Sequence, residues 1–504
     1  MNIATNLERS AFYFPDHPAM AEGLSETSYA RFNENSNRVA TGLIKLGIKP
    51  GDHVGLCAPN SGEWLAFYFG VLKAGAVAVT LSSLLKPDEL TLLVNHSRPK
   101  FIFTHDEKLN ALEKLRGDEC LDKIISNSGD MSFSQLLKTG SVTFKAVDRD
   151  RDDTAAILYT GGTTGTPKGV MLTHENINMA IHNVVFNERS SEKDRALLFL
   201  PFNHVFGQMH IMNPTILSGG CLDMIPAFDL DQVIEVLDRG QVSRLFAVPT
   251  VYVRLLALED LKKKLKAVNY CFSAAASMAA EVVHKWKELT GLQIFESYGM
   301  TEAAPMVTYN HYHHYRHVIG SVGTPVPGVE VQIRDEKGGR LEEGEKGEIC
   351  IRGRNIMKGY LDNPEANRDA FWDNGWFRSG DVGVFEDDGY LFIVDRLKDM
   401  IITGGENVYS REVEEVLYTH PGVSECAVIG LPDKEWGERV TACIILKQDK
   451  SIDGKELKAY MKSRLSSFKV PKEFRVMDDF PRSPAGKMLK RELREKILQE
   501  SKGK

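Results

Sequence analysis

Short apolar runs that alternate with helical stretches are the feature that most restricts the fold of this chain. Up to about residue 150, runs such as HVGLCA and KFIFTH alternate with helical stretches such as SYARFNENSNRVATGLIKLG. From 151 to about 330 the strand candidates are TAAILY, RALLFLP, CLDMIPA, SRLFAV, AVNYCFSA and LQIFES. This alternation predicts parallel β-strands joined by crossover helices, because a parallel connection needs a dozen or more residues.

The pattern changes twice towards the C-terminus. Between about 318 and 395, glycine and proline become dense, and the runs VEVQIRD, GEICIRG and GYLFIVD predict antiparallel hairpins in a small β subdomain. After Asp395-Arg396 the sequence predicts a compact α+β unit of ordinary small-domain size. We therefore expect an α/β fold with a large N-terminal domain of αβ-layered sheets, residues 1–397, and a small mobile C-terminal lid, residues 398–504.

Composition and charge exclude several classes of protein. The 504 residues are 42% hydrophobic and 26% charged, which excludes a disordered, collagenous or coiled-coil chain. The formal net charge of −7 argues against a general nucleic-acid binder. The charge is uneven, because residues 451–504 hold 15 Lys+Arg and 8 Asp+Glu and are therefore +7.

Three features bear on the compartment. The seven cysteines are scattered and never spaced as C-x-x-C, which favours free thiols in a reducing compartment. Glu8 and Arg9 interrupt the region where a secretory signal needs its apolar stretch. The most apolar segment, 64–81, is broken by two glycines and a lysine and predicts a core helix running into a buried strand. We expect a cytoplasmic protein with no integral membrane segment; peripheral membrane contact and a homodimer stay open.

Residues 159–169, YTGGTTGTPKG, have the composition of a phosphate-binding loop. Four glycines free the backbone to expose successive N–H groups, four threonines add hydroxyl donors, and Lys168 adds a positive charge. The Walker A motif is excluded, since it would require glycine at Pro167 and Ser or Thr at Gly169. A Gly/Thr hairpin turn is the structural alternative, although a turn needs fewer donors and no lysine.

Six ordered motifs resemble the adenylate-forming superfamily of acyl-CoA synthetases, beetle luciferases and peptide-synthetase adenylation domains. The loop is similar to the family's Y-T-S-G-T-T-G-x-P-K-G, with Gly161 in place of the serine. The others are YGMTE at 298–302, WFRSGD at 376–381, DRLKD at 395–399, GGENVY at 404–409 and PRSPAGK at 481–487. The resemblance covers about residue 20 to the C-terminus and implies ATP, Mg²⁺ and coenzyme A as cofactors.

The resemblance also implies which residues bind the nucleotide. Glu302 and Thr160 would hold Mg²⁺, since a hard cation prefers carboxylate and hydroxyl oxygens. Tyr298 could stack on adenine, while Asp381 and Arg396 would bind the ribose. Outside the motifs, such residues would be a packing tyrosine and solvated charges. The implied nucleotide set is Thr160, Gly161, Gly162, Thr163, Thr164, Gly165, Lys168, Ala275, Ser297, Tyr298, Gly299, Thr301, Asp381 and Arg396.

The C-terminal lid supplies the main predicted catalytic group. Lys487, in the Ser-Pro-Ala-Gly loop, would stabilise the charge that builds on the α-phosphate when a carboxylate attacks it. The lid would turn about Lys398 between two half-reactions. In the second arrangement, glycines let a pantetheine arm approach the backbone, and the +7 tail attracts the CoA phosphates, although an ordinary exposed lysine-rich helix would look the same. The implied CoA set is Gly404, Gly405, Trp436, Phe468, Lys469 and Lys472.

The sequence says less about the site that binds the carboxylic acid substrate. NHVFG at 203–207 resembles the family's segment whose histidine or aromatic residue flanks the carboxylate, so His204 joins Lys487, Lys398 and Glu302 as a predicted catalytic residue. SAAAS at 273–277 falls where relatives commonly show glycines, and its methyl groups would narrow the tunnel or shift the adenine contact. No arginine lies in these segments, which disfavours a dicarboxylate such as malonate.

A histidine-rich run, 310–317, is the one candidate for a separate metal site. It has no nearby cysteine and no helix-spaced histidine pair, so we interpret it as a loop near the mouth of the active site.

We therefore predict an AMP-forming acyl-CoA synthetase, which makes acyl-AMP and pyrophosphate and then transfers the acyl group to CoA. A medium- or long-chain fatty acid is the first expectation, and an aromatic or alicyclic acid the second. A stand-alone adenylation enzyme that loads a carrier protein is the alternative, and a non-catalytic adenylate-binding protein is a third reading.

Overall fold

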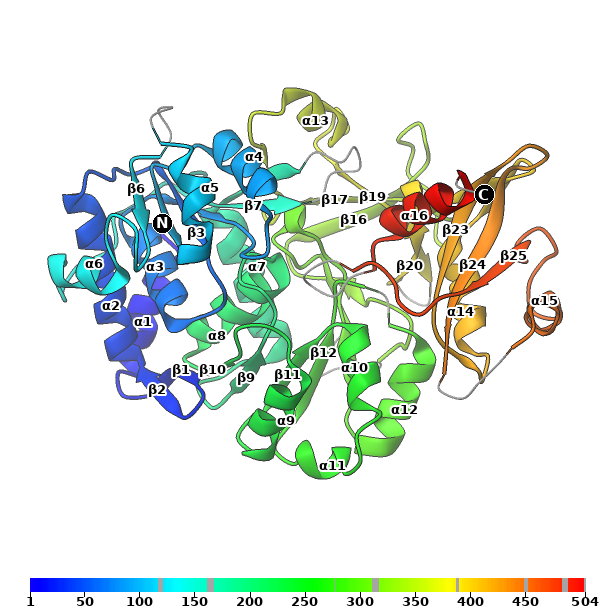
Figure 1. The fold of residues 1–504 in the computed structure, drawn as a ribbon, viewed down its shortest axis with the longest axis horizontal. Helices are drawn as coiled ribbons and strands as arrows, with labels where there is room; N and C mark the ends of the chain where they lie inside the picture. Colours follow the sequence, from blue (N-terminus) through cyan, green and yellow to red (C-terminus); the bar gives the residue numbers. More distant parts are fainter. Residues whose placement is uncertain are drawn as a thin grey trace.

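The computed structural model of the chain describes residues 1–116, 121–160, 167–276, 278–310, 317–386, 389–447, 452–482 and 488–502. It is a layered α/β structure with two large sheets, a smaller antiparallel sheet and a C-terminal α+β unit (Figure 1). This arrangement confirms the predicted fold class.

The first sheet carries the phosphate loop. Its strands, in spatial order, are β18 (Gly359–Tyr360), β8 (Lys168–Thr173), β7 (Thr154–Thr160), β4 (Val77–Thr80), β3 (His53–Cys57), β5 (Phe101–Thr104) and β6 (Lys123–Ile125). The central strands are parallel, as predicted, and are buried on both faces. β8 is antiparallel to β7, because the loop between them is too short for a crossover.

The second sheet has the order β13 (Ile294–Glu296), β12 (Tyr270–Ser273), β11 (Arg244–Ala247), β9 (Arg195–Leu198), β10 (Cys221–Met224), β1 (Pro18–Glu22) and β2 (Ser25–Ser28). Every neighbouring pair in it is parallel except β1 and β2. The six strand candidates between 151 and 330 are all confirmed, and the predicted site segments follow four of them, β7, β9, β12 and β13.

Helices connect the strands and cover the sheets. They are α1 (Thr5–Tyr13), α2 (Tyr29–Lys45), α3 (Gly62–Lys73), α4 (Pro87–Ser97), α5 (Leu109–Glu113), α6 (Phe133–Thr139), α7 (His174–Glu188), α8 (Asn213–Ser218), α9 (Leu230–Asp238), α10 (Pro249–Leu255), α11 (Leu261–Lys264) and α12 (Ala280–Thr290). A π-helical segment, η2 (Phe206–Met212), precedes α8, and a short 3₁₀ turn, η1 (Asp106–Lys108), precedes α5.

Helix α3 lies between the two large sheets. Its Phe67 ring stacks on Phe103 of β5, with centroids 4.9 Å apart, and its Trp64 ring packs on Phe202 just after β9, at 4.8 Å. A helix that is apolar on all sides is stable only when it is buried all round. The segment 64–81 is therefore a core helix followed by β4, as predicted. Within the described part of the chain, no helix combines the length and the apolar character needed to cross a membrane.

The antiparallel sheet follows the two large ones. Its strands are β16 (Val329–Arg334), β17 (Gly347–Gly353), β19 (Phe377–Glu386) and β20 (Tyr390–Arg396), and a short pair, β14 (Thr308–Tyr309) with β15 (Thr324–Pro325), precedes it. The predicted hairpin runs all lie on it. The segment between β17 and β19 leaves this sheet, because β18 pairs with β8 of the first sheet before α13 (Pro364–Asp369).

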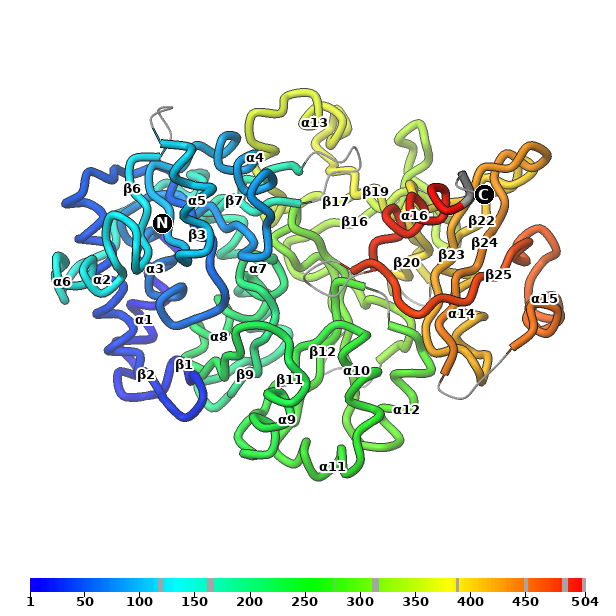
Figure 2. The backbone as a smooth tube through the Cα atoms, in the orientation of Figure 1, coloured from blue at the N-terminus to red at the C-terminus, as the bar shows by residue number. Residues whose placement is uncertain are grey.

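The C-terminal unit, orange to red in Figure 2, has two hydrophobic clusters of its own. Its strands are β21 (Ile401–Thr403), β22 (Glu406–Val408), β23 (Val423–Asp433), β24 (Gly437–Leu446) and β25 (Glu473–Val476), with helices α14 (Ser410–Tyr418), α15 (Gly454–Lys462) and α16 (Lys490–Lys502). The 3₁₀ turn η4 (Leu397–Asp399) precedes β21. The domain boundary at Lys398 stays a prediction.

Candidate active site

The predicted phosphate loop begins and ends on paired strands. The register of β7 and β8 pairs Thr160 with Lys168, the two residues on either side of the loop. Nδ1 of His96, on α4, lies 2.7 Å from the hydroxyl of Tyr159, so a helix from another part of the sheet supports the stem. The loop residues 161–166, which include the predicted Gly161, Gly162, Thr163, Thr164 and Gly165, lie outside the described residues.

Three side chains next to this stem form a cluster that we term the metal corner: Lys168, Glu302 and Tyr360. Glu302 lies on the 3₁₀ turn η3 (Thr301–Ala303), and its Oε1 accepts a 3.0 Å hydrogen bond from the Tyr360 hydroxyl. The Lys168 ammonium lies 4.8 Å from the centroid of the Tyr360 ring, a cation–π distance. The structure therefore brings together the loop lysine and the carboxylate predicted to bind Mg²⁺.

The carboxyl group of Glu302 is in an environment that disfavours its charge. Burial raises its pKa, and the repulsion from Asp381 adds to that effect, while the hydrogen bond from Tyr360 opposes it. A divalent cation would reverse this balance, since a hard cation prefers carboxylate oxygen. The residues present therefore fit a Mg²⁺ ion held with the ATP phosphates.

A second cluster, which we term the ribose corner, consists of Tyr298, Asp381 and Arg396. The Tyr298 hydroxyl donates to Oδ2 of Asp381 at 2.7 Å, and Nε of Arg396 lies 3.4 Å from Oδ1. Asp381 and Arg396 are direct partners across β19 and β20, which fixes their separation. Tyr298 is only 7% exposed, so its described contact is through the hydroxyl. Stacking of its ring on adenine stays a prediction.

The backbone conformation shows why small residues stand at two positions of the nucleotide set. Ala275 has φ +70, in the left-handed region that favours glycine, so this chain holds an alanine where glycine would be unstrained. At Gly299 a Cβ atom would lie 1.3 Å from the Pro305 carbonyl oxygen, so only glycine fits. Thr301 is buried and Ser297 is half-buried in the same turn region.

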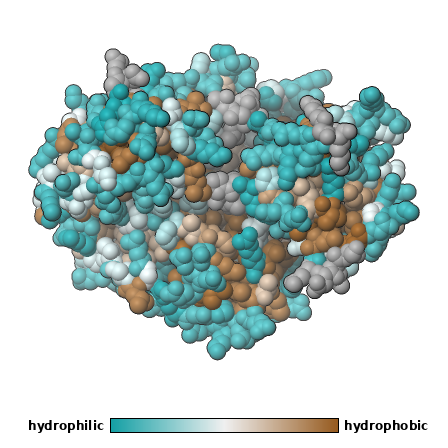
Figure 3. Space-filling model, viewed as in Figure 1, coloured by the Kyte–Doolittle hydropathy of each residue, from teal (hydrophilic) through white to brown (hydrophobic). Residues whose placement is uncertain are grey.

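His204 lies at the start of the segment predicted to flank the carboxylate. Its Nδ1 accepts a hydrogen bond of 3.2 Å from the backbone N–H of Phe206, which fixes the ring next to η2. Farther along η2, His210 stacks on Phe272 with centroids 4.3 Å apart and meets Phe206 edge-on. An aromatic wall, built from η2 and β12, thus continues from His204. Figure 3 shows hydrophobic residues gathered low in the centre of the molecule, where Figure 1 draws α10 and β12.

The polar and charged side chains behind this wall are paired with one another. Nε2 of His210 lies 2.9 Å from Oε1 of Glu188, and the Tyr270 hydroxyl donates to the same oxygen at 3.0 Å. Arg244 donates to both carboxylate oxygens of Asp194, at 2.9 and 3.0 Å. Its remaining N–H groups donate to backbone carbonyls. His210 and Arg244 therefore both have carboxylate partners from the protein.

In the C-terminal unit, three of the predicted CoA residues form a cluster that we term the Trp436 cluster. The Lys472 ammonium lies 3.7 Å from the centroid of the Trp436 ring. A Cβ atom at Gly404 would lie 2.9 Å from Trp436 Cε3, so the glycine is needed for this approach. Gly404 and Gly405 both have positive φ, +61 and +84, in the turn between β21 and β22.

The other predicted lid residues have different surroundings. Lys469 is paired with Glu412 at 2.6 Å, and Phe468 packs against the hydrophobic cluster of the unit. Lys398 lies exposed on η4. Lys487 lies outside the described residues, as do residues 311–316 of the histidine run. His317 is described, and its ring meets Phe295 edge-on at 5.3 Å.

Two contacts near these clusters do not follow from the sequence motifs. Tyr360 belongs to no motif that was singled out, and only its pairing with Val170 places it beside the phosphate loop. Asp395 belongs to the hinge motif, and it accepts hydrogen bonds from the backbone N–H and hydroxyl of Ser410 at the start of α14. A carboxylate that stabilises the N-terminus of a helix can be recognised in a sequence when it lies directly before that helix. Here the helix begins fifteen residues after the carboxylate, so the sequence gives no such signal.

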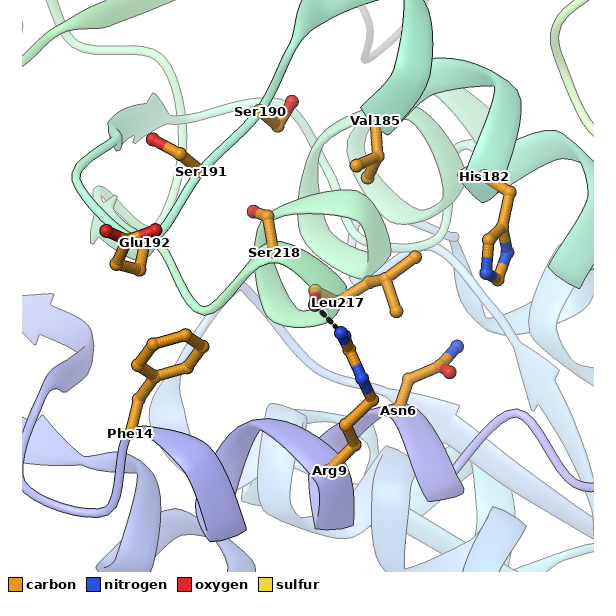
Figure 4. A pocket seen from close by; sticks show the side chains of 10 residues that line it. All are labelled: Asn6, Arg9, Phe14, His182, Val185, Ser190, Ser191, Glu192, Leu217 and Ser218. Carbon is orange, nitrogen blue, oxygen red and sulfur yellow. Dashed lines mark hydrogen bonds between the residues drawn. The ribbon is translucent and has the colours of Figure 1, made fainter.

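A surface groove lies apart from these clusters. It has a volume of about 560 Å³ and lies between α1, α7 and the end of α8, with Arg9 donating to the Leu217 carbonyl at 3.2 Å (Figure 4). It shares no residue with the predicted nucleotide, CoA or catalytic sets.

Comparison with known proteins identifies the family of the chain. The profile described as AMP-binding enzyme matches residues 7–361, and the profile of the AMP-binding enzyme C-terminal domain matches 412–487. The chain is 35% identical over 497 residues to a feruloyl-CoA synthase of Amycolatopsis sp, covering 97% of this chain and 98% of that protein. It is 32% identical over 525 residues to a long-chain-fatty-acid–CoA ligase of Bacillus subtilis, covering 97% and 93%.

The solved structures of MatB from Rhodopseudomonas palustris are 33% identical to the chain and cover 99% of both chains. The ATP-bound form superposes with a TM-score of 0.92 and the apo form with 0.81. The chain therefore belongs to the AMP-binding enzyme family and is an AMP-forming acid–thiol ligase.

Proposed function

We propose that the chain activates an apolar monocarboxylic acid, in the first place a medium- or long-chain fatty acid, and transfers the acyl group to CoA. The observation that carries the choice of acid is the aromatic wall that continues from His204, together with the pairing of the charges behind it. A second carboxylate would need a buried cation, and both His210 and Arg244 already have carboxylate partners.

In the first half-reaction the acid attacks the α-phosphorus of ATP, forming acyl-AMP and releasing pyrophosphate. The loop residues and Lys168 would hold the phosphates, and the ribose corner would bind the sugar. A Mg²⁺ ion held by Glu302 and the hydroxyl of Thr160 would neutralise phosphate charge when bound. Lys487 would stabilise charge on the α-phosphate, and His204 would flank the carboxylate.

In the second half-reaction the CoA thiolate attacks the acyl carbonyl and AMP leaves. We propose that residues 398–504 turn about Lys398 so that Gly404, Gly405 and the Trp436 cluster replace Lys487 at the acyl group. The chain superposes better on ATP-bound MatB than on apo MatB, which supports an adenylation arrangement in this structure. Lys398→Pro should trap one arrangement and separate the two half-reactions; wild-type rates for both would remove the hinge.

Two alternatives have specific support. The 35% identity to a feruloyl-CoA synthase favours an aromatic acid as the second choice, since flat rings pack well against aromatic walls. An alicyclic acid would pack there less closely. A stand-alone enzyme that loads a carrier protein is less favoured, because the Trp436 cluster offers an aromatic ring and a cation that suit free CoA.

A panel of acids tests the proposal. Pyrophosphate release would be measured with octanoate, palmitate, ferulate, benzoate, cyclohexanecarboxylate and malonate. CoA and a phosphopantetheinylated carrier protein would then be compared as acceptors. We expect the fatty acids to be the best substrates, malonate to give background rates, and CoA to be the acceptor. Malonate as the best substrate would overturn the proposed apolar monocarboxylic acid. Exclusive transfer to the carrier protein would overturn the proposal that CoA is the acyl acceptor.

We also propose a cytoplasmic location. The six described cysteines are all free and buried, as thiols in a reducing compartment would be. Alkylation of the unfolded protein without a reductant should modify every cysteine, whereas protected cysteines would contradict this location.

A further inference from the structure

Tyr360 contacts both Glu302 and Lys168, two side chains of opposite charge type, and lies between them. Its hydroxyl donates to Glu302 at 3.0 Å, and its ring face holds the Lys168 ammonium at 4.8 Å from the centroid. The side chain is 7% exposed, and burial together with the neighbouring Glu302 raises its pKa, so the hydroxyl stays protonated and donates.

The backbone around Tyr360 is held on several sides. The side-chain amide of Asn367 accepts from the Tyr360 N–H at 2.6 Å and donates to its carbonyl at 3.0 Å. The backbone N–H of Met357 donates to the Glu302 carbonyl at 2.8 Å, and that of Leu361 donates to the Gly169 carbonyl at 2.8 Å. The segment 357–361 therefore ties the Glu302 turn to the strand that follows the phosphate loop.

The chemistry of the two contacts is complementary. A direct ion pair between Lys168 and Glu302 would neutralise both charges before any nucleotide arrived. The aromatic face instead binds the ammonium weakly, as exposed cation–π contacts do, so phosphate can compete for it. The hydroxyl occupies one carboxylate oxygen and orients the group, which leaves the other oxygen for a cation.

We propose that Tyr360 is a positioning residue for the divalent cation and the ATP phosphates, acting through Glu302 with its hydroxyl and through Lys168 with its ring. This inference rests on the proposed function, because it assigns a task within the same nucleotide site. It predicts that the two halves of one side chain have separable effects on binding.

Isothermal titration of ATP, once with MgCl₂ and once with EDTA, separates these effects. Tyr360→Phe removes the hydroxyl and keeps the ring, so the Mg²⁺ concentration for half-maximal ATP binding should rise about tenfold, while binding in EDTA stays unchanged. Tyr360→Leu removes both, so ATP binding should weaken in MgCl₂ and in EDTA. The same Mg²⁺ requirement should appear in acid-dependent pyrophosphate exchange.

Tyr29→Phe is the matched control. Tyr29 is a fully buried tyrosine of α2 whose hydroxyl donates to the Gly220 carbonyl at 2.7 Å, so its loss tests general destabilisation. It should lower the melting temperature without moving the Mg²⁺ requirement. An unchanged Mg²⁺ requirement in Tyr360→Phe, or an equal shift in both variants, would overturn the inference. Failure of the wild-type chain to bind ATP with MgCl₂ would instead overturn the proposed function, and this inference with it.

Discussion

The two corners of the nucleotide site differ in how their carboxylates are compensated. In the ribose corner, Asp381 has a hydroxyl on one oxygen, at 2.7 Å, and a guanidinium near the other, at 3.4 Å. In the metal corner, Glu302 has a neutral donor, and burial raises its pKa. In the ribose corner, Asp381 therefore already has protein partners before the ligand binds, and the sugar hydroxyls have to replace some of these contacts. The metal corner is short of positive charge until a cation arrives.

The largest effect should come from a residue outside both corners. If the corners suffice to hold the nucleotide, Lys487→Ala should leave ATP binding unchanged and slow acyl-AMP formation by about 10³-fold, since the lysine acts on transition-state charge. Thioester formation from supplied acyl-AMP should be spared. Rapid-quench measurement of each half-reaction checks this, and equal loss in both would show that the lysine has another task.

Removing the charge of the metal corner should have the next largest effect. Glu302→Gln keeps the shape of the side chain and should slow Mg²⁺-dependent adenylation by about 10²-fold, through the several kcal/mol that metal-assisted charge stabilisation provides. ATP binding in EDTA should not weaken, because the carboxylate repels phosphate when no cation is present. Titration with and without MgCl₂ is the measurement, and equal weakening in both conditions would contradict a metal role.

The ribose corner should respond to sugar chemistry instead of to metal. Asp381→Asn should weaken ATP binding about tenfold, the scale of a lost charge-assisted hydrogen bond. The wild-type chain should prefer ATP over 2′-deoxy-ATP and 3′-deoxy-ATP, and the variant should lose that preference. Competition binding checks this, and a variant that still discriminates would place the ribose elsewhere.

The comparison also shows how far the sequence could lead. The strands of the large sheets were predictable because runs such as YCF in β12 are apolar and the strand is buried on both faces. Asp381 and Arg396 could be named from motifs, and their pairing follows from neighbouring strands. The hydroxyl contact of Tyr298 could not be foreseen, because it joins residues 83 positions apart through tertiary packing.

The part of the site that sequence missed is held together by a strand too short to predict. β18 has two residues, and its pairing with β8 depends on Asn367, whose side chain completes hydrogen bonds that a longer strand would make to another strand. The antiparallel return of the chain after the loop is a second feature that the apolar runs leave undetermined. Alternating apolar runs predict strands, but the direction of β8 is decided by the length of the loop.

The smallest expected effect concerns a third carboxylate, which is compensated even less than Glu302. Glu296 ends β13 and is 6% exposed, and in the described part of the chain its Oε2 has no hydrogen-bond partner. Burial raises its pKa to about 7, opposed by the charge of Arg411. The folded chain therefore holds a proton that the unfolded chain has lost above about pH 4.5, so stability falls as the pH rises through this window and then levels off, by at most about 3 kcal/mol.

Glu296→Gln removes this titration and should raise the melting temperature by a few degrees at pH 8, where the wild-type carboxyl is ionised, with a smaller difference at pH 5. Thermal unfolding of both proteins at the two pH values measures it. Glu235→Gln is the control, because Glu235 is an exposed carboxylate of α9 paired with Arg239, and its loss should have the same small effect at both pH values. If the difference in melting temperature between wild type and Glu296→Gln does not grow with pH, the folded protein stabilises the ionised Glu296 carboxylate. Glu296 would then not be the least stabilised of the three carboxylates.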